Sequence, residues 1–191
     1  MVFDLGNVIV DVNYPHFANK LGISLKKFKN FVESDEFKNF ELGIVDEREF
    51  LDHLSKYNNI DQEQIKIIRD RPLLKFALRK KTYKIIHYLK NKYSIYLLSN
   101  TNPIDFLAID KWLDLRKIFK KCYLSYEQHY SKPSVKLFKN AEEFFSINAR
   151  NVLFLDDKIE NISGAEECGW NTIHVKSEDQ LIKKLQEEGI L

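Results

Sequence analysis

The chain has 191 residues and a formal net charge of +2, with 44% hydrophobic and 30% charged residues. This length suits one domain with a buried core, or one domain carrying an insertion. The near-neutral charge and scattered lysines argue against nucleic acid as the main partner, since phosphate-backbone binding needs a concentrated basic face. We expect neither a membrane span nor a signal peptide, because no apolar run is long enough. Cys122 and Cys168 lack metal-type spacing, so we expect buried free thiols in a reducing, cytoplasmic compartment.

Residues 2–11 (VFDLGNVIVD) form an apolar run that carries Asp4 and breaks at Gly6 and Asn7. An unpaired carboxylate is costly to bury, so we expect Asp4 to lie where a short buried strand ends. In open parallel sheets this edge is where ligands bind. On this stretch alone, an aspartate that merely caps the next turn is an equally good interpretation.

Residues 14–71 show no strand pattern and several helix signals. Ser24 precedes apolar residues at helical spacing over 25–32. Two pairs have the spacing of capping boxes, which begin helices: Asp46 with Glu49, and Asp61 with Gln64. We therefore expect an all-helical insertion at 14–71, which interrupts an α/β domain made of residues 1–13 and 72–191.

From residue 72 onward, helix and strand patterns alternate. The expected helices cover residues 72–90, 110–119, 134–144, a segment after residue 157, and 179–188. The expected strands cover residues 93–98, 122–124, 151–155 and 172–175. Helices alternating with strands predict an α/β fold, a Rossmann-like parallel sheet with helices on both faces.

Polar residues interrupt the apolar pattern at three strand ends. These residues are Asp4, Ser99 with Asn100, and Asp156 with Asp157. A parallel sheet brings such ends to one edge, where gathered carboxylates repel one another unless a cation lies among them. Carboxylate oxygens suit Mg²⁺, whereas a hydroxyl, a helix N-terminus and a lysine such as Lys132 suit phosphate. A metal-held carboxylate facing a phosphate is a nucleophile for phosphoryl transfer.

Four ordered motifs resemble those of the haloacid dehalogenase (HAD) superfamily. They are residues 3–8 (FDLGNV), 98–100 (LSN), 132–133 (KP) and 156–165 (DDKIENISGA). Single dipeptides among them are common, but their order, spacing and strand-end placement make the resemblance specific. It covers the whole chain and includes the helical insertion, which resembles the helical cap of that family. Within the superfamily, the chain is similar to bacterial sugar-phosphate phosphatases of the glucose-1-phosphatase type and to the phosphatase domain of soluble epoxide hydrolase.

The resemblance implies a Mg²⁺-dependent phosphatase that hydrolyses a small phosphorylated metabolite, such as a sugar phosphate, through an aspartyl-phosphate. Asp4 would attack the phosphorus. Lys132 would neutralise the nucleophile and the transferring phosphate. Ser99 and Asn100 would hydrogen-bond the phosphoryl oxygens, although a turn-forming Ser-Asn pair is the simpler alternative.

The resemblance also implies the metal ligands. Asp157 would hold Mg²⁺ together with Asp4 and the backbone carbonyl of Gly6. Asp156 is either a further direct ligand or a partner of one. Asn161 lies one helical turn after Asp157 and would hydrogen-bond a metal ligand.

One position departs from the pattern of most phosphatases in this family. They carry a second aspartate two residues after the nucleophile, as general acid and base, whereas this chain has Gly6. General acid–base help is worth roughly 10²–10⁴-fold in rate. The similar sugar-phosphate subgroup also has glycine here, so the departure does not by itself indicate an inactive protein. Asp11 and His16 are candidates for a substitute.

The helical cap is expected to set substrate choice by closing over the reaction edge. Asn39, Glu41, His53 and Arg71 are candidate substrate contacts, with ordinary helix-surface residues as the alternative. Two other functions stay open: 2-haloacid dehalogenation on the same scaffold, and a regulatory protein that binds a phosphate ligand without turnover. The sequence leaves the substrate and the oligomeric state undetermined.

Overall fold

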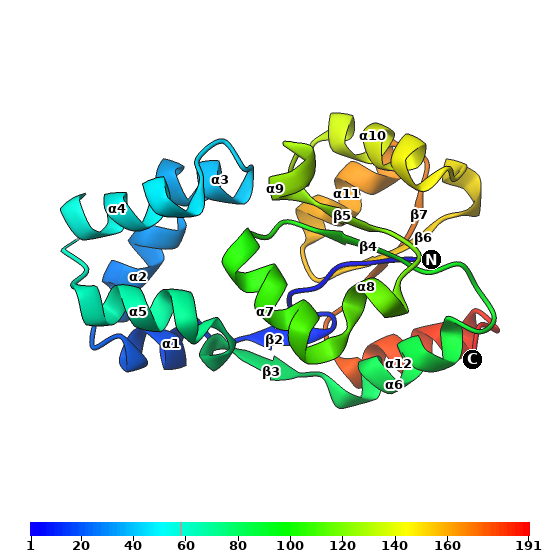
Figure 1. Ribbon diagram of the computed structural model, residues 1–191. Coiled ribbons are helices and arrows are strands. Elements are labelled where there is room, and N and C mark those ends of the chain that lie inside the picture. Colours follow the sequence, from blue (N-terminus) through cyan, green and yellow to red (C-terminus); the bar gives the residue numbers. More distant parts are fainter. Residues whose placement is uncertain (58) are drawn as a thin grey trace.

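The computed structural model describes residues 1–57 and 59–191, which form an α/β core and a group of helices at one end (Figure 1). Within these residues, the core sheet has five parallel strands in the order β5-β4-β1-β6-β7. The strands are β1 (Val2–Phe3), β4 (Tyr96–Ser99), β5 (Cys122–Leu124), β6 (Leu153–Asp156) and β7 (Asn171–His174). The predicted parallel α/β fold is confirmed.

Helices cover both faces of this sheet (Figure 1). One face packs against α10 (Val135–Phe145) and α11 (Ile159–Glu167). The other face packs against α6 (Lys80–Leu89), α7 (Pro103–Leu113), α8 (Leu115–Ile118) and α12 (Glu178–Glu187). The short segments α9 (Ser125–Gln128) and η2 (Ala149–Asn151) complete the core.

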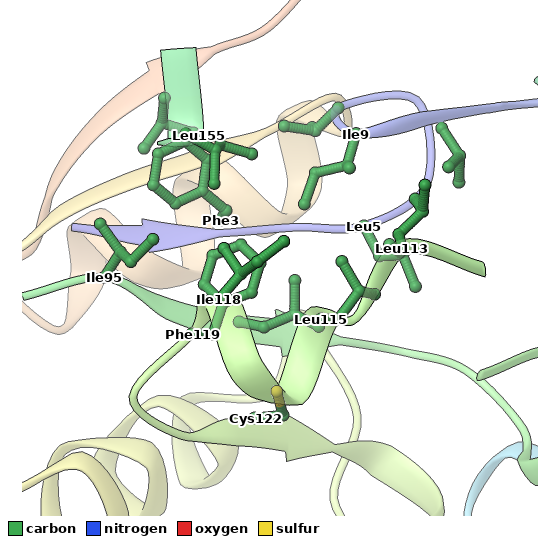
Figure 2. Packing of buried hydrophobic residues seen from close by; sticks show 14 of the residues in the cluster. Phe3, Leu5, Ile9, Ile95, Leu113, Leu115, Ile118, Phe119, Cys122 and Leu155 are labelled. Atoms are coloured by element: carbon green, nitrogen blue, oxygen red, sulfur yellow. The ribbon is translucent and has the colours of Figure 1, made fainter. Parts of the chain in front are cut away.

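Side chains of the central strands alternate between the two faces, as the pleat of a strand requires. Phe3 and Leu155 pack with the helices of the second face, as Figure 2 shows, whereas Val2 and Phe154 pack with α10 and α11. Both faces of the sheet are therefore buried, which explains why the strand segments are continuous apolar runs in the sequence.

A second group of helices is inserted between β2 (Val10–Val12) and β3 (Phe76–Leu78), which pair antiparallel. These helices are α1 (Tyr14–Lys20), α2 (Leu25–Val32), α3 (Asp35–Glu41), α4 (Glu47–Tyr57) and α5 (Gln62–Asp70), and η1 (Pro72–Lys75) leads into β3. We call α1–α5 the cap. It has its own core, which is rich in phenylalanine. The β2–β3 pair connects it to the sheet domain (Figure 1).

The helix starts predicted in the cap are confirmed. The Ser24 hydroxyl accepts from the Lys27 backbone at the start of α2. Both capping boxes form, with reciprocal side-chain and backbone bonds at the starts of α4 and α5. Each box pairs two backbone N–H groups that a helix start leaves without partners.

Two other predictions need correction. A single helix over 72–90 is wrong, because residues 76–78 form β3 and complete the antiparallel pair with β2. A helix over 110–119 is also wrong in its bounds, since α7 ends at Leu113 and Asp114 turns the chain with a positive φ of 53°. Of the two free thiols, Cys122 is buried and Cys168 is only half-buried. None of the helices within residues 1–57 and 59–191 has the length and apolar character needed to span a membrane.

Candidate active site

The polar residues predicted at three strand ends meet at one edge of the sheet. Asp4 follows β1, Ser99 ends β4, and Asp156 ends β6, and β1 lies between the other two strands. The Asp4 backbone N–H donates to the Leu155 carbonyl at 2.9 Å, which holds Asp4 against β6. The parallel topology therefore brings together side chains that are about 150 residues apart in the chain.

Lys132 lies at the centre of this group. Its Nζ donates to Asp4 Oδ1 at 2.7 Å, to Asp156 Oδ2 at 2.6 Å and to the Leu98 carbonyl at 3.0 Å. These contacts use all three ammonium hydrogens, so the buried charge is fully hydrogen-bonded. Burial lowers the pKa of Lys132, but the two carboxylates outweigh that effect and the net shift is upward. Lys132 therefore stays protonated.

The carboxylates outnumber this single cation. Asp4, Asp156 and Asp157 have oxygens that all lie within 4.8 Å of one another. Burial raises the pKa of Asp4 above its ordinary value; Lys132 opposes that rise, whereas Asp156 and Asp157 add to it. The excess of negative charge and the hard oxygen donors suit a divalent cation such as Mg²⁺.

The three carboxylates differ in how many oxygens remain available. Asp156 is fully buried, and its Oδ1 accepts from the Lys158 backbone at 2.8 Å and from Asn161 Nδ2 at 2.9 Å. Its Oδ2 accepts from Lys132 and, at 3.0 Å, from Asn161 Nδ2. A carboxylate offers about four lone-pair sites, so Asp156 has little capacity left for a cation. Asn161 thus contacts Asp156 rather than Asp157.

Asp157 is held by Asn7 and His174, neither of which had a predicted role. Asn7 Nδ2 donates to Asp157 Oδ2 at 2.9 Å, and His174 Nε2 lies 2.9 Å from the Asp157 carbonyl. Asn7 has a positive φ of 51°, and its Oδ1 accepts from the Val12 backbone, so the loop after Asp4 orients it. Asp157 Oδ1 carries no protein bond among the described residues, which leaves it for a cation.

Ser99 and Asn100, the predicted phosphate ligands, lie at this edge of the sheet and differ in the hydrogen bonds that they already make. Ser99 is buried, and among the described residues its hydroxyl makes only a long 3.4 Å contact with the Asn100 carbonyl. It is therefore free to donate to a better acceptor. The Asn100 amide instead pairs with the Lys132 backbone, through its Nδ2 at 3.0 Å and its Oδ1 at 2.9 Å. Asn100 fixes the loop that carries Lys132 and keeps one N–H hydrogen for a ligand.

A cavity of about 70 Å³ lies between this edge and the cap. Its walls include Gly6, Tyr14, Glu41, Lys75 and Ser99. This space holds several waters or one small polar group. The cavity therefore joins the predicted reaction edge to residues from the cap and from the β2–β3 connection.

Glu41, the last residue of α3, is the cap carboxyl that lines this cavity. It keeps some exposed surface, because one side opens on the cavity, while protein packs around the rest. Burial and, next, the charge of Asp105 raise the pKa of Glu41 to about 7; Lys158 and Lys75 act in the opposite direction. A carboxyl with a pKa near neutrality can both give and take a proton under physiological conditions.

The turn that carries Glu41 is anchored directly to the core. The Ser125 hydroxyl lies 2.6 Å from the Glu41 carbonyl, and His129 Nδ1 lies 2.8 Å from the Leu42 carbonyl. Gly43 follows with a positive φ of 65°, and a Cβ built there would stand 2.1 Å from the Tyr126 carbonyl. No local sequence pattern indicates these contacts, because they join residues more than 80 positions apart.

An ion pair closes the other side of the cavity. Lys75 Nζ of η1 lies 2.6 Å from Asp105 Oδ1 of α7, and both side chains are almost completely buried. Asn102 Nδ2 donates to the other Asp105 oxygen at 3.0 Å. The cavity wall therefore carries fixed charges of both signs, which suits a ligand with several hydroxyl groups.

The other candidates from the sequence lie elsewhere. Asp11 accepts from Arg79 Nε at 2.7 Å on the β2–β3 pair, and His16 is exposed on α1. Neither residue lines the cavity. Asn39 and His53 line a separate groove on the cap.

Arg71, the remaining candidate, is exposed at the end of α5. Among the four candidate substrate contacts, Glu41 is thus the one that lines the cavity.

A family model described as haloacid dehalogenase-like hydrolase matches residues 1–169. A D-ribitol-5-phosphate phosphatase from Bacteroides thetaiotaomicron is 29% identical over 187 residues, covering 90% of this chain and 89% of that protein. A predicted HAD-like family hydrolase from Porphyromonas gingivalis has a TM-score of 0.84 at 26% identity, covering 98% of this chain and 95% of that one. A HAD family enzyme from B. thetaiotaomicron, in complex with magnesium and inorganic phosphate, has a TM-score of 0.77 at 26% identity, covering 92% and 93%.

Proposed function

This chain belongs to the haloacid dehalogenase-like hydrolase family, and from that premise we propose that it is a Mg²⁺-dependent phosphatase of small phosphomonoesters. The observation that carries the proposal is the position of Lys132, which bridges Asp4 and Asp156 at 2.7 and 2.6 Å while a third carboxylate lies nearby. In this arrangement the Asp4 carboxylate can act as a nucleophile. The remaining negative charge of the site favours the binding of a cation.

The residues fit a Mg²⁺ ion by their donor chemistry. Asp4, Asp157 and the backbone carbonyl of Gly6 would hold it, since Asp157 Oδ1 has no bond to any described residue and the oxygens of Asp4 and Asp157 lie close together. When bound, the ion would neutralise charge between the nucleophile and the phosphate. Asp156, whose oxygens already accept four bonds, acts by positioning Lys132 rather than as a ligand.

The reaction then divides into two displacements at phosphorus. Asp4 attacks the phosphate, the bond to the alcohol breaks, and an aspartyl-phosphate forms. Water attacks this intermediate, releases inorganic phosphate and restores Asp4. Lys132 offsets the charge on Asp4 and on the transferring group, and Ser99 donates to a phosphoryl oxygen.

The substrate is proposed to be a small sugar or polyol phosphate. The relative that hydrolyses D-ribitol-5-phosphate supports this class, because the similarity covers most of both chains. The polar walls of the cavity support it further, since such walls can hydrogen-bond hydroxyl groups. A cap over the reaction edge leaves room for a metabolite and not for a folded phosphoprotein.

The test is release of inorganic phosphate from a panel of sugar and polyol phosphates, with Mg²⁺ present. We expect turnover by the wild-type chain, background rates for Asp4→Asn, and loss of turnover on chelation of Mg²⁺. Asp179→Asn, a change of an exposed carboxylate on α12, is the matched control and should leave the rate unchanged. Unchanged turnover in Asp4→Asn would remove the proposed nucleophile. Chloride release from 2-haloacids without phosphatase activity would instead identify a dehalogenase.

A further inference from the structure

The proposed phosphatase lacks a proton donor for its leaving group at the expected place. Gly6, two residues after the nucleophile, has no side chain, and a Cβ built there would have Val12 Cγ2 as its neighbour, at an ordinary contact distance of 3.5 Å. The φ of Gly6 lies outside the left-handed region, so a side chain is compatible with its backbone. The space beside Gly6 is therefore part of the cavity, open to a group from another element.

Glu41 and Gly6 line the same cavity, together with Ser99 of the reaction edge. The charged and titratable groups that face the Glu41 carboxyl are Asp105 of α7, Lys75 of η1, Lys158 after β6 and Tyr14 of α1. Lys158 directly follows the Asp156-Asp157 pair, so the Glu41 carboxyl lies within electrostatic reach of a residue at the reaction edge.

The Glu41 carboxyl makes no hydrogen bond or ion pair with the protein among residues 1–57 and 59–191, although its backbone is firmly held. Ser125 binds the Glu41 carbonyl, and Gly43 fits against the Tyr126 carbonyl with no room for a side chain. A carboxyl whose backbone is anchored, and whose residue lines a cavity, is available to a bound ligand.

We propose that Glu41 of the cap is the general acid and base of the reaction, in place of the side chain that Gly6 lacks. This inference rests on the proposed phosphatase function. In the first step, the Glu41 carboxylic acid gives its proton to the ester oxygen as the phosphorus–oxygen bond breaks, so the leaving group departs as a neutral alcohol. In the second step, the Glu41 carboxylate takes a proton from the water that attacks the aspartyl-phosphate. The products are the alcohol and inorganic phosphate, and Glu41 is again protonated.

The position of Glu41 on the cap has a second consequence. Because Glu41 reaches the cavity only through the docked turn, a complete acid–base site exists only when the cap is seated on the core. Proton transfer is thereby coupled to closure over the substrate, which excludes water from the first step.

The test compares wild-type and Glu41→Gln proteins, with Mg²⁺, on an alkyl phosphate and an activated aryl phosphate. An aryl alcohol leaves without a proton, so the variant should still release one equivalent of it in a burst and then stall at the aspartyl-phosphate. On the alkyl phosphate we expect kcat to fall roughly 10²–10³-fold, with KM changed less than threefold. Glu63→Gln, an exposed cap glutamate, is the matched control and should behave as wild type.

Rescue separates catalysis from a structural role. Gly6→Asp places a carboxylate on the core side of the same cavity, so Gly6→Asp/Glu41→Gln should recover at least tenfold of the lost alkyl-phosphate turnover. The pH profile supplies an independent readout: wild-type kcat/KM on the alkyl phosphate should fall as the pH rises through Glu41 ionisation, and Glu41→Gln should lack this limb.

Each contrary result has a distinct meaning. A wild-type chain that releases no phosphate from any substrate contradicts the proposed phosphatase itself. An active wild type with Glu41→Gln at the same rate overturns only the role of Glu41. An increase in KM with an unchanged kcat and pH profile also overturns it, and identifies Glu41 as a substrate-binding residue.

Discussion

The hydroxyl of Ser125 lies 2.6 Å from the backbone carbonyl of Glu41, so a side chain of the core holds the turn of the cap that faces the reaction edge. The same hydroxyl accepts from the Thr101 backbone N–H at 2.9 Å, at the end of β4. One buried residue therefore connects the strand that carries Ser99 to the cap residue that we propose as acid and base.

Removing the Ser125 hydroxyl should lower both the stability of the fold and the rate of the reaction. In Ser125→Ala, the buried Thr101 N–H loses its acceptor, and an unsatisfied buried donor costs about 1–3 kcal/mol. We expect denaturant unfolding to show a loss of this size, and kcat on a sugar phosphate to fall because Glu41 is no longer held. Ser163→Ala, at an exposed position of α11, should change stability by less than about 0.5 kcal/mol. Equal behaviour of the two variants would contradict the role of Ser125.

Two cap glycines offer a matched pair for testing whether the cap must dock. Gly22 and Gly43 have positive φ values of 66° and 65°, so alanine meets similar backbone strain at each. A Cβ at Gly22 meets nothing within 4 Å, whereas a Cβ at Gly43 would stand 2.1 Å from the Tyr126 carbonyl. We expect Gly22→Ala to cost about 1–2 kcal/mol with kcat/KM retained, and Gly43→Ala to lower kcat/KM at least tenfold by displacing the turn. Retained kcat/KM in Gly43→Ala would show that catalysis does not need this docking.

The distinct roles proposed for the acidic pair predict different metal affinities. Asp157→Asn should weaken Mg²⁺ binding at least tenfold in a calorimetric titration, because a ligand is lost. Asn161→Ala frees Asp156 from two hydrogen bonds and should lower kcat about tenfold, while Mg²⁺ affinity stays within threefold. If Asp156 were itself a ligand, loss of its Asn161 partner would lower metal affinity 10–100-fold. That result would identify Asp156 as a metal ligand and contradict its proposed role in positioning Lys132.

Ionisation of Glu41 should appear in the pH dependence of stability. Its pKa is raised to about 7 in the folded chain, mainly by burial, from an ordinary value of 4.5. Between these values the folded state binds more protons than the unfolded state, so stability is lost as the pH rises from 4.5 to 7. Glu41→Gln removes this term, so the wild type should lose stability relative to the variant across that range. Urea unfolding at several pH values with Mg²⁺ present measures the difference, and parallel curves would contradict the raised pKa.

The polar residues at the strand ends were predictable from the sequence because the signal is local. An apolar run that stops at a polar residue, as at Asp4 and Ser99, indicates a buried strand and its end. Parallel pairing then brings such ends to one edge of the sheet, as the order β4-β1-β6 does here. Helix starts at Ser24, Asp46 and Asp61 were predictable for the same reason, since a capping bond spans only three residues.

Contacts between residues far apart in the sequence were decided by the tertiary structure alone. The segment 76–78 has an apolar pattern that also fits a helix, and only pairing with β2 makes it a strand. Ser125 and His129 have no motif around them, because each contacts a residue more than 80 positions away. Asn7 lies within the first motif, but its contact with Asp157 spans 150 positions and could not be seen in the sequence. No feature of the sequence distinguished among the four polar residues of residues 14–71 that were candidate substrate contacts. Glu41 alone of these lines the cavity, because the turn after α3 is the part of the cap that seats on the core.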